Sequence, residues 1–533
     1  MKRLLSLIFI ICFIIFCFAG CGNSKKNPSM QTIYYNLKSE PASLDPQIAN
    51  DESSQLIISN IFEGLVKIDS NNDILPAVSK NYESNDNFTS FTFHLRDDAK
   101  WSDKNSTPVT ADDFVFALKR AISPRTKSST AYNLLPIKNA KEINSGSLKE
   151  SSLGVYAIDP YTLKIDLEYS YEQFPRLMAL PVAMPCNQRL FDNTNGQYGL
   201  QADYVISNGP FMLKDKQKES LILVKNENYR GNYEAIPISV NFTIGSLSGS
   251  VFDNIEKGKI DAGPIDTSDI SSAEKRKYNI TSFEDTTWGL TFNLDSSIFK
   301  NLNIRKAFVQ SLDRDYVLST IPSNSSIAND IIMSSIMFEG NRYRNIAGDN
   351  LYLQKSSDAK SILNSGKSEL GLKSLPSITV LCPEDSAVKS LVSNMIEIWN
   401  KELDDYFNME PVSDDKLKEK LNSGNYQIAV APIQVTDNDP LDILSKFTSD
   451  SMYNVFNMDD SNYDSIISKA TDANSTERLN LCIQAEKYIN NQAVFYPLYC
   501  NKRFFGSSPN VKNIIFYQYG GVVDFTKTTK GRK

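Results

Sequence analysis

The sequence predicts an α/β protein of two or three domains, on two observations. About 510 residues remain once a leader at 1–20 is removed, which is more than one hydrophobic core accommodates. The later half alternates strand and helix patterns, with strands expected at 376–382, 426–431 and 494–499 and helices at 303–318, 386–403, 414–422 and 475–491. This order is typical of βαβ units, whereas the first third mixes strand pairs with a helix, as an α+β domain does.

The chain begins with the pattern of an exported lipoprotein. Lys2 and Arg3 precede an apolar run at 4–18, which is shorter than the roughly 20 residues that a membrane span needs. Phe18-Ala19-Gly20-Cys21 resembles a bacterial lipobox, a signal in which cleavage precedes the cysteine and the thiol carries a lipid. We expect a signal peptide at 1–20, a lipid on Cys21, a tether at 21–30 and a location on the extracytoplasmic face of the cell membrane. The alternative is an uncleaved anchor helix.

The first third contains recognisable elements. Phe91-Thr-Phe-His-Leu95 alternates as a half-buried strand does, and a second strand pair is expected at 154–158 and 162–167, around Asp159-Pro160. Thr110 is the expected N-cap of a helix that ends before Pro124. Asp112 and Asp113 follow that cap and oppose the helix dipole, so we interpret them as capping residues and not as a catalytic carboxylate pair. Further strands are expected after the turn at 207–210 and at 220–224, and a short helix at 251–257.

Composition argues against several functional classes. The net charge is −7, and about −9 after removal of the leader with Lys2 and Arg3, so no nucleic-acid partner is expected. The single histidine, His94, lies in the strand-like FTFHLR and cannot build a His-rich zinc site. GxSxG, HExxH, P-loop and GxGxxG patterns do not occur. We therefore expect no enzyme activity, no cofactor and no metal site.

The exported part contains four scattered cysteines besides Cys21: Cys186, Cys382, Cys482 and Cys500. Because no CxxC occurs, we expect buried thiols that act as small apolar side chains. A Cys482–Cys500 disulfide stays open as an alternative.

A series of motifs runs through nearly the whole exported chain. The longest is FTFHLRDDAKWSDKNSTPVTADDFVF at 91–116. The others are EPASLDP at 40–46, IFEGL at 61–65, SNGP at 207–210, Asn228-Tyr229, GKID at 258–261 and a run from Phe292 to Asp315. Together they resemble the extracellular solute-binding proteins of family 5, the oligopeptide- and dipeptide-binding lipoproteins of bacterial ABC importers.

The resemblance implies a two-lobed periplasmic-binding-protein-like fold of class II (cluster C), with an extra α+β domain inserted in the first lobe. Carried onto this chain, lobe I is 31–52, 190–284 and 503–533, the extra domain is 53–189, and lobe II is 285–502. It also implies a monomeric, lipid-anchored receptor that captures peptides between its lobes and delivers them to an ABC permease. The alternatives are a signalling peptide or non-peptide solute in the same fold, a secreted hydrolase, or a cell-surface scaffold.

In the family, the peptide lies extended and pairs with strand segments of both lobes. Its ammonium group meets an aspartate in a segment resembling D-Y-x-D/E-P. Here that segment is Val435-Thr-Asp-Asn-Asp-Pro440, so Thr436 stands at the anchor position, Asp437 follows it and Asp439 matches the second acid. Either Asp437 replaces the anchor, or the ligand differs, or the acids form a turn before Pro440.

Five further residues are candidate ligand contacts by the same resemblance. Trp288 corresponds to aromatic residues that line the cleft, Asn208 and Gly209 to a cleft-side turn, and Glu40 to an early cleft-edge residue. Tyr132 lies in a loop that reaches toward the site. A structural role is the alternative for each, and the sequence gives neither the length nor the side-chain preference of a ligand.

Overall fold

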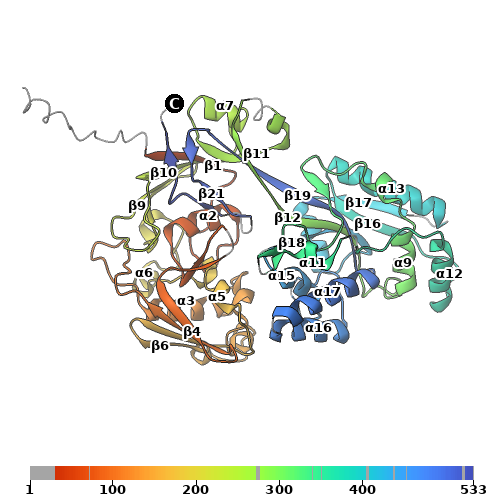
Figure 1. The fold of residues 1–533 in the computed structure, drawn as a ribbon, viewed down its shortest axis with the longest axis horizontal. Helices are drawn as coiled ribbons and strands as arrows, with labels where there is room; N and C mark the ends of the chain where they lie inside the picture. The colour runs from red at the N-terminus through yellow and green to blue at the C-terminus, as the bar shows by residue number, and fades with distance from the viewer. Residues whose placement is uncertain are drawn as a thin grey trace, which may run out of the picture.

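The computed structural model describes residues 31–70, 73–271, 276–338, 340–349, 351–403, 407–435, 438–451, 453–473, 475–518 and 522–531. Two lobes lie side by side and share one eleven-stranded sheet (Figure 1). The predicted leader and Cys21 lie outside the described residues.

The first lobe is built on one half of the shared sheet, in the order β11-β1-β10-β9-β8. β1 (Thr32–Leu37) lies between β10 (Ser239–Ile244) and β11 (Ala262–Ile265) and is parallel to both. β9 (Ser220–Lys225) and β8 (Phe211–Lys216) continue it as antiparallel strands. Tyr35 of β1 is buried, and its ring meets Phe525 edge-on, with ring centroids 5.3 Å apart.

The second lobe contains the predicted βαβ units. β16 (Ile378–Pro383) lies between β17 (Phe407–Val412) and β18 (Ile428–Gln434) and is parallel to both. α13 (Ser386–Glu402) connects β16 to β17, and α14 (Asp414–Asn422) connects β17 to β18. The single helix expected at 303–318 is wrong: α9 (Leu302–Gln310) and α10 (Arg314–Leu318) are separate, because the Asp313 side chain accepts the backbone N–H of Tyr316 and starts a new helix.

Two long strands connect the lobes. β12 (Asn279–Phe292) and β19 (Phe495–Ser507) pair antiparallel from Asn279 opposite Ser507 to Thr291 opposite Phe495. At one end β19 pairs with β11 of the first lobe, and at the other β12 pairs with β18 of the second. The register shifts between Glu284 and Thr286 and again between Trp288 and Gly289. Because β12 and β19 connect the two lobes, we call them the hinge strands.

A separate antiparallel sheet, in the order β4-β5-β7-β6, forms the extra domain together with α3. Its strands are β4 (Ser79–Ser84), β5 (Ser90–Leu95), β7 (Thr162–Asp166) and β6 (Val155–Asp159). Thr110 is the N-cap of α3 (Ala111–Ile122) and forms a capping box with Asp113. The capping interpretation of Asp113 is therefore confirmed. The residue bounds predicted for the three domains stay a prediction.

The remaining elements are shorter or surround these sheets. The helices are α2 (Glu52–Ile61), η2 (Ala131–Leu134), α4 (Ala140–Asn144), η3 (Glu150–Ser152), α5 (Phe174–Leu177), η4 (Pro181–Ala183), α6 (Gln188–Asn193), η5 (Ala202–Tyr204), α7 (Val251–Glu256), η6 (Thr267–Asp269), α11 (Tyr343–Ala347), α12 (Ala359–Glu369), α15 (Pro440–Leu444), η7 (Ser445–Phe447), α16 (Ser461–Asp472) and α17 (Ser475–Asn491). The strands are β2 (Val66–Ile68), β3 (Ile74–Pro76), β13 (Ser325–Ile327), β14 (Met337–Phe338), β15 (Asn341–Arg342), β20 (Val511–Lys512), β21 (Ile515–Phe516), β22 (Val523–Asp524) and β23 (Thr529–Lys530).

The four cysteines of the described chain are buried free thiols, so Cys482 and Cys500 form no disulfide. His94 lies in β5, with its Nε2 3.5 Å from a carboxylate oxygen of Glu83. Within the described ranges, no helix has the length and apolarity to cross a membrane, and His, Cys, Asp and Glu form no group of three that could hold a metal ion.

Candidate binding site

The topology of the second lobe places a switch point at the carboxyl ends of β16 and β18. α13 packs into one hydrophobic cluster through Leu391 and Trp399, whereas α14 packs into a different cluster through Leu417 and Leu421. The connection after β16 therefore runs over one face of the sheet to β17, and the connection after β17 runs over the other face to β18. Ligands of open α/β sheets bind outside the carboxyl ends of the strands at such a switch point.

The connection from β18 to α15 starts at this switch point and is fixed on both sides. Val435 is buried, and its N–H donates to the carbonyl of Asp285 on a hinge strand at 2.8 Å. Asn438 accepts the N–H of Met337 at 2.8 Å through its side-chain oxygen. The predicted anchor positions, Thr436 and Asp437, lie between these points and outside the described residues.

Asp439 uses its carboxylate within the protein. It accepts the N–H of Leu441 at 2.9 Å and so caps α15, and it forms an ion pair with Arg478 of α17. Burial lowers the pKa of the Arg478 guanidinium, but the Asp439 carboxylate raises it, and the net shift is upward. Asp439 therefore shapes the start of α15.

Trp288 lies at the same edge of the sheet as the β18–α15 connection. It is half-buried on β12 opposite Pro432, and its ring stacks on Tyr499 at 5.9 Å with planes 11° apart. Burial, followed by the Asp385 carboxylate, raises the pKa of the Tyr499 hydroxyl. The Trp288 indole N–H is buried and has no acceptor among the described residues. It is a donor that a ligand carbonyl or an ordered water can satisfy.

Arg503 joins the hinge strands to the first lobe. Its Nε lies 2.5 Å from the Asp285 carboxylate, and its Nη1 lies 3.1 Å from the Glu52 carboxylate at the start of α2. Its Nη2 donates to the carbonyl of Gln518 at 2.9 Å, and the Gln518 side chain in turn donates to the carbonyl of Glu284. Sequence reasoning missed this residue, because Arg503 belongs to no motif and its partners are distant along the chain.

Glu40 lies at the carboxyl edge of the first lobe. It follows Leu37, the last residue of β1, and is exposed. Its carboxylate lies 3.3 Å from the Lys216 ammonium. Glu40 is therefore at the edge of the first lobe, as Trp288 and the β18–α15 connection are at the edge of the second.

Asn208 and Gly209 lie instead in a buried joint between the first lobe and the extra domain. The Asn208 side chain accepts the N–H of Glu63 at 3.0 Å and donates to its carbonyl at 2.8 Å. The Gly209 N–H donates to the carbonyl of Ile61 at 2.9 Å, and a Cβ on Gly209 would stand 2.8 Å from the Ile61 carbonyl carbon. These contacts bind protein backbone, so both residues have a structural role, and their ligand contact stays a prediction.

Other motif residues converge on the same joint. The Glu63 carboxylate accepts the Tyr229 hydroxyl at 2.6 Å and the Arg96 guanidinium at 2.9 Å. Burial raises the pKa of Glu63, although Arg96 opposes the shift. Nearby, Asp45 of the EPASLDP motif forms a buried ion pair with Arg120 of α3 at 2.6 Å. The motifs that carry the resemblance therefore stabilise a domain junction.

Tyr132 projects from the extra domain toward the second lobe. Its ring meets Tyr453 edge-on, with centroids 5.0 Å apart and planes at 89°. The structure thus places Tyr132 against protein.

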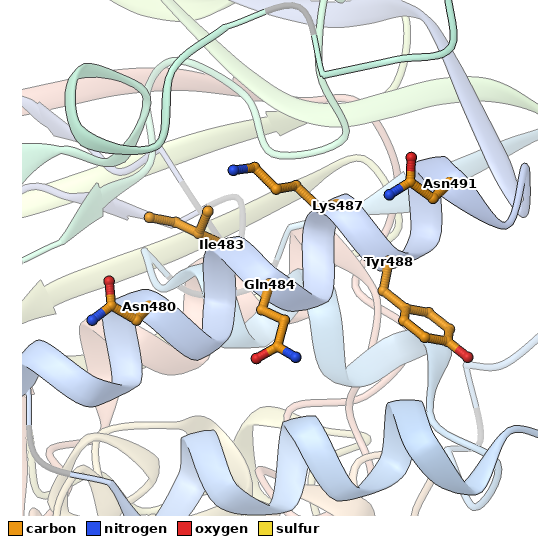
Figure 2. A pocket seen from close by; sticks show the side chains of 6 residues that line it. All are labelled: Asn480, Ile483, Gln484, Lys487, Tyr488 and Asn491. Atoms are coloured by element: carbon orange, nitrogen blue, oxygen red, sulfur yellow. The ribbon is translucent and has the colours of Figure 1, made fainter.

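Two surface hollows lie elsewhere. One, of about 370 Å³, is lined by six side chains that all belong to α17 (Figure 2). Figure 2 shows Lys487 and Asn491 on one side of the helix and Gln484 and Tyr488 on another, so these side chains do not converge. The second, of about 620 Å³, lies beside α3, where Arg120 packs against Phe191 and Tyr198. Neither hollow includes a residue predicted to bind ligand.

Known proteins resemble the chain along most of its length. A family model described as "Bacterial extracellular solute-binding proteins, family 5 Middle" matches residues 73–454. The dipeptide-binding protein DppE of Bacillus subtilis (strain 168) is 25% identical over 507 residues, which cover 94% of this chain and 92% of DppE. The oligopeptide-binding protein OppA of the same organism is 26% identical over 536 residues, which cover 97% of each chain.

A solved structure has the same fold. The structure of Listeria monocytogenes OppA bound to peptide is similar with a TM-score of 0.74 and 23% sequence identity, covering 94% of this chain and 99% of that chain. The predicted two-lobed periplasmic-binding-protein-like fold is confirmed.

Proposed function

The chain belongs to family 5 of the bacterial extracellular solute-binding proteins, and from this membership we propose that it is a peptide receptor of an ABC importer. In this proposal a lipid on Cys21 holds the protein at the extracytoplasmic face of the membrane. The two lobes close on a peptide by bending at the hinge strands, and the loaded receptor delivers it to the permease.

The observation that carries the proposal is the position of the β18–α15 connection. It follows a strand at a switch point and begins against a hinge strand through the Val435–Asp285 hydrogen bond, which supports a ligand position beside it. Asp439 at its end already serves α15 and Arg478. Asp437 is therefore the acid we assign to the positive end of the ligand.

The chemistry of such an anchor follows from burial. A carboxylate enclosed by the two lobes needs a partner, because an unpaired buried charge is costly. A peptide ammonium group supplies it through charge-assisted hydrogen bonds. The Trp288 indole N–H, which lacks a described acceptor at the same edge, is suited to a carbonyl of the ligand backbone.

Calorimetry on paired peptides tests this function. Removing one member of a buried charge pair costs about 2–5 kcal/mol in binding. Asp437→Asn should therefore weaken a free-amino peptide by roughly 30-fold or more, at about 1.4 kcal/mol per factor of ten. The same variant should barely affect the N-acetylated peptide.

Asp439→Asn is the matched control, because its carboxylate acts on α15 and Arg478; it should lower stability without distinguishing the two peptides. If Asp437→Asn binds both peptides as the unaltered protein does, the anchor lies elsewhere. Native mass spectrometry of protein purified without denaturant identifies the natural ligand, and a retained non-peptide solute would refute peptide capture.

A further inference from the structure

A tyrosine of the extra domain meets the second lobe. Tyr132 contacts Tyr453 edge-on, with ring centroids 5.0 Å apart and ring planes at 89°. Tyr453 follows α15 and η7 in the chain, so the extra domain meets the second lobe in the segment after these helices.

Tyr132 is held by the core of its own domain. It belongs to η2, whose first and last residues, Ala131 and Leu134, are buried in the large cluster of the first lobe and extra domain. Its carbonyl accepts the N–H of Leu135 at 3.2 Å. Because the flanking side chains are anchored, the Tyr132 ring moves with the extra domain as a unit.

Tyr453 is supported from the opposite side. Its carbonyl accepts the N–H of Val455 at 2.7 Å, and the Lys446 ammonium lies 5.5 Å from its ring centroid. Lys446 is buried and pairs at 2.8 Å with the carboxylate of Asp442, which is part of α15. A continuous series of contacts therefore connects Tyr132, through Tyr453 and Lys446, to the short helix that follows the β18–α15 connection.

We propose that Tyr132 and Tyr453 form a latch that holds the extra domain against the second lobe in the closed receptor. Tyr132 then acts as a positioning residue for α15 and its preceding segment, in place of the ligand contact expected from the sequence. The inference rests on the proposed function, since closure around a ligand is part of it.

The latch acts through the closing equilibrium. A contact that forms only when the two parts meet favours the closed state, and the apparent affinity for any ligand scales with the population of that state. An edge-to-face aromatic pair contributes about 0.5–1.5 kcal/mol beyond its buried area, which corresponds to roughly 2- to 12-fold in a population ratio. Loss of the latch should therefore lower the affinity for unrelated ligands by the same factor, mainly by raising their dissociation rates.

The test combines Tyr132→Ala, Tyr453→Ala and the double variant with two measurements. Small-angle scattering of the ligand-free protein should show a larger radius of gyration for each single variant. Dissociation rates of two peptides of unrelated sequence should rise about 2- to 12-fold, equally for both. The double variant should change the radius of gyration and the release rates no more than either single variant does, because each single substitution already removes the whole contact. Tyr132→Phe keeps the ring and loses only the hydroxyl, so its effects on the radius of gyration and on release should be smaller than those of Tyr132→Ala.

Tyr156→Ala is the matched control, because Tyr156 is an exposed tyrosine of the same domain, on β6, and should leave both measurements unchanged. Additive single effects, or unaltered scattering and release, would overturn the latch. So would a factor that differs between the two peptides, which would make Tyr132 a ligand contact. If no peptide binds, the proposed function fails and the scattering of the ligand-free variants alone decides on the latch.

Discussion

Replacing Arg344 with methionine tests how the second lobe is held together. Arg344 is buried, with its Nη1 3.3 Å from the Asp330 carboxylate and its Nη2 paired with Glu486. Glu486 is 0% exposed and also accepts the N–H of Ile332. Methionine retains much of the apolar stem, so the substitution removes charge more than volume. It removes the cation that pairs with two buried carboxylates, and breaking a buried ion pair typically costs about 3–5 kcal/mol.

The loss of unfolding free energy in Arg344→Met should depend on pH, and the burial of Glu486 determines in which direction. Burial raises the pKa of Glu486 above its ordinary value of 4.5, and Arg344 opposes that rise. Without Arg344 the pKa rises further, so the folded variant takes up a proton at a pH where the unfolded chain does not. The destabilisation is therefore largest at pH 7 and shrinks as the pH falls toward 4.5.

Urea unfolding at pH 7 and pH 5, followed by tryptophan fluorescence, measures both effects, since Trp288 and Trp399 lie in the second lobe. Arg276→Met is the control: this arginine lies 3.3 Å and 3.1 Å from the exposed carboxylates of Asp253 and Glu256, and its loss should leave the unfolding free energy unchanged within error. A loss below about 1 kcal/mol for Arg344→Met at pH 7, or an equal loss at both pH values, would refute the reasoning.

Three further outcomes are expected. Cys21→Ala should retain the mass of the leader or release the protein from membranes, whereas unchanged mass and membrane partitioning would exclude lipidation. Gly209→Ala should cost about 1–3 kcal/mol, because its Cβ would stand 2.8 Å from fixed backbone; Gly531→Ala, whose nearest contact is 3.5 Å, should be neutral in the same unfolding assay. Burial raises the pKa of the Cys482 and Cys500 thiols to about 12, so a thiol reagent at pH 8 should label neither until urea unfolds the protein, and labelling of the native protein would contradict their burial.

Local periodicity predicted four elements of the βαβ part of the second lobe, because β16, α13, α14 and β18 each have a clear residue spacing within a short window. The strand β17 (Phe407–Val412) between the two helices was not predicted from the sequence. The prediction of one helix at 303–318 was wrong because of Asp313, which caps a second helix. Asp313 can sit inside a helix or cap one, and only the acceptance of the Tyr316 N–H decides between them. Such a capping bond competes with the helix ladder.

The site was harder to predict for a different reason. The motifs at Glu63, Asn208 and Tyr229 identified important residues, but a motif does not say what its residues touch, and these meet one another in a domain joint. Arg503 carries no local signal, because its partners Glu52, Asp285 and Gln518 come from three distant segments. The resemblance indicated a ligand contact for Tyr132, which stays a prediction, but gave no sign of its ring contact with Tyr453 of the opposite lobe.

The hinge strands also affect the order in which the chain folds. β19 completes the sheet of the first lobe by pairing with β11, and Phe525 packs against Tyr35 of β1. The first strand to be synthesised therefore finds its full set of neighbours only when residues near 500–525 have appeared. Pairings this remote in sequence form slowly, because a large loop must close before the contacts stabilise it. A chain built this way keeps its first lobe incomplete until nearly the whole sequence has been synthesised.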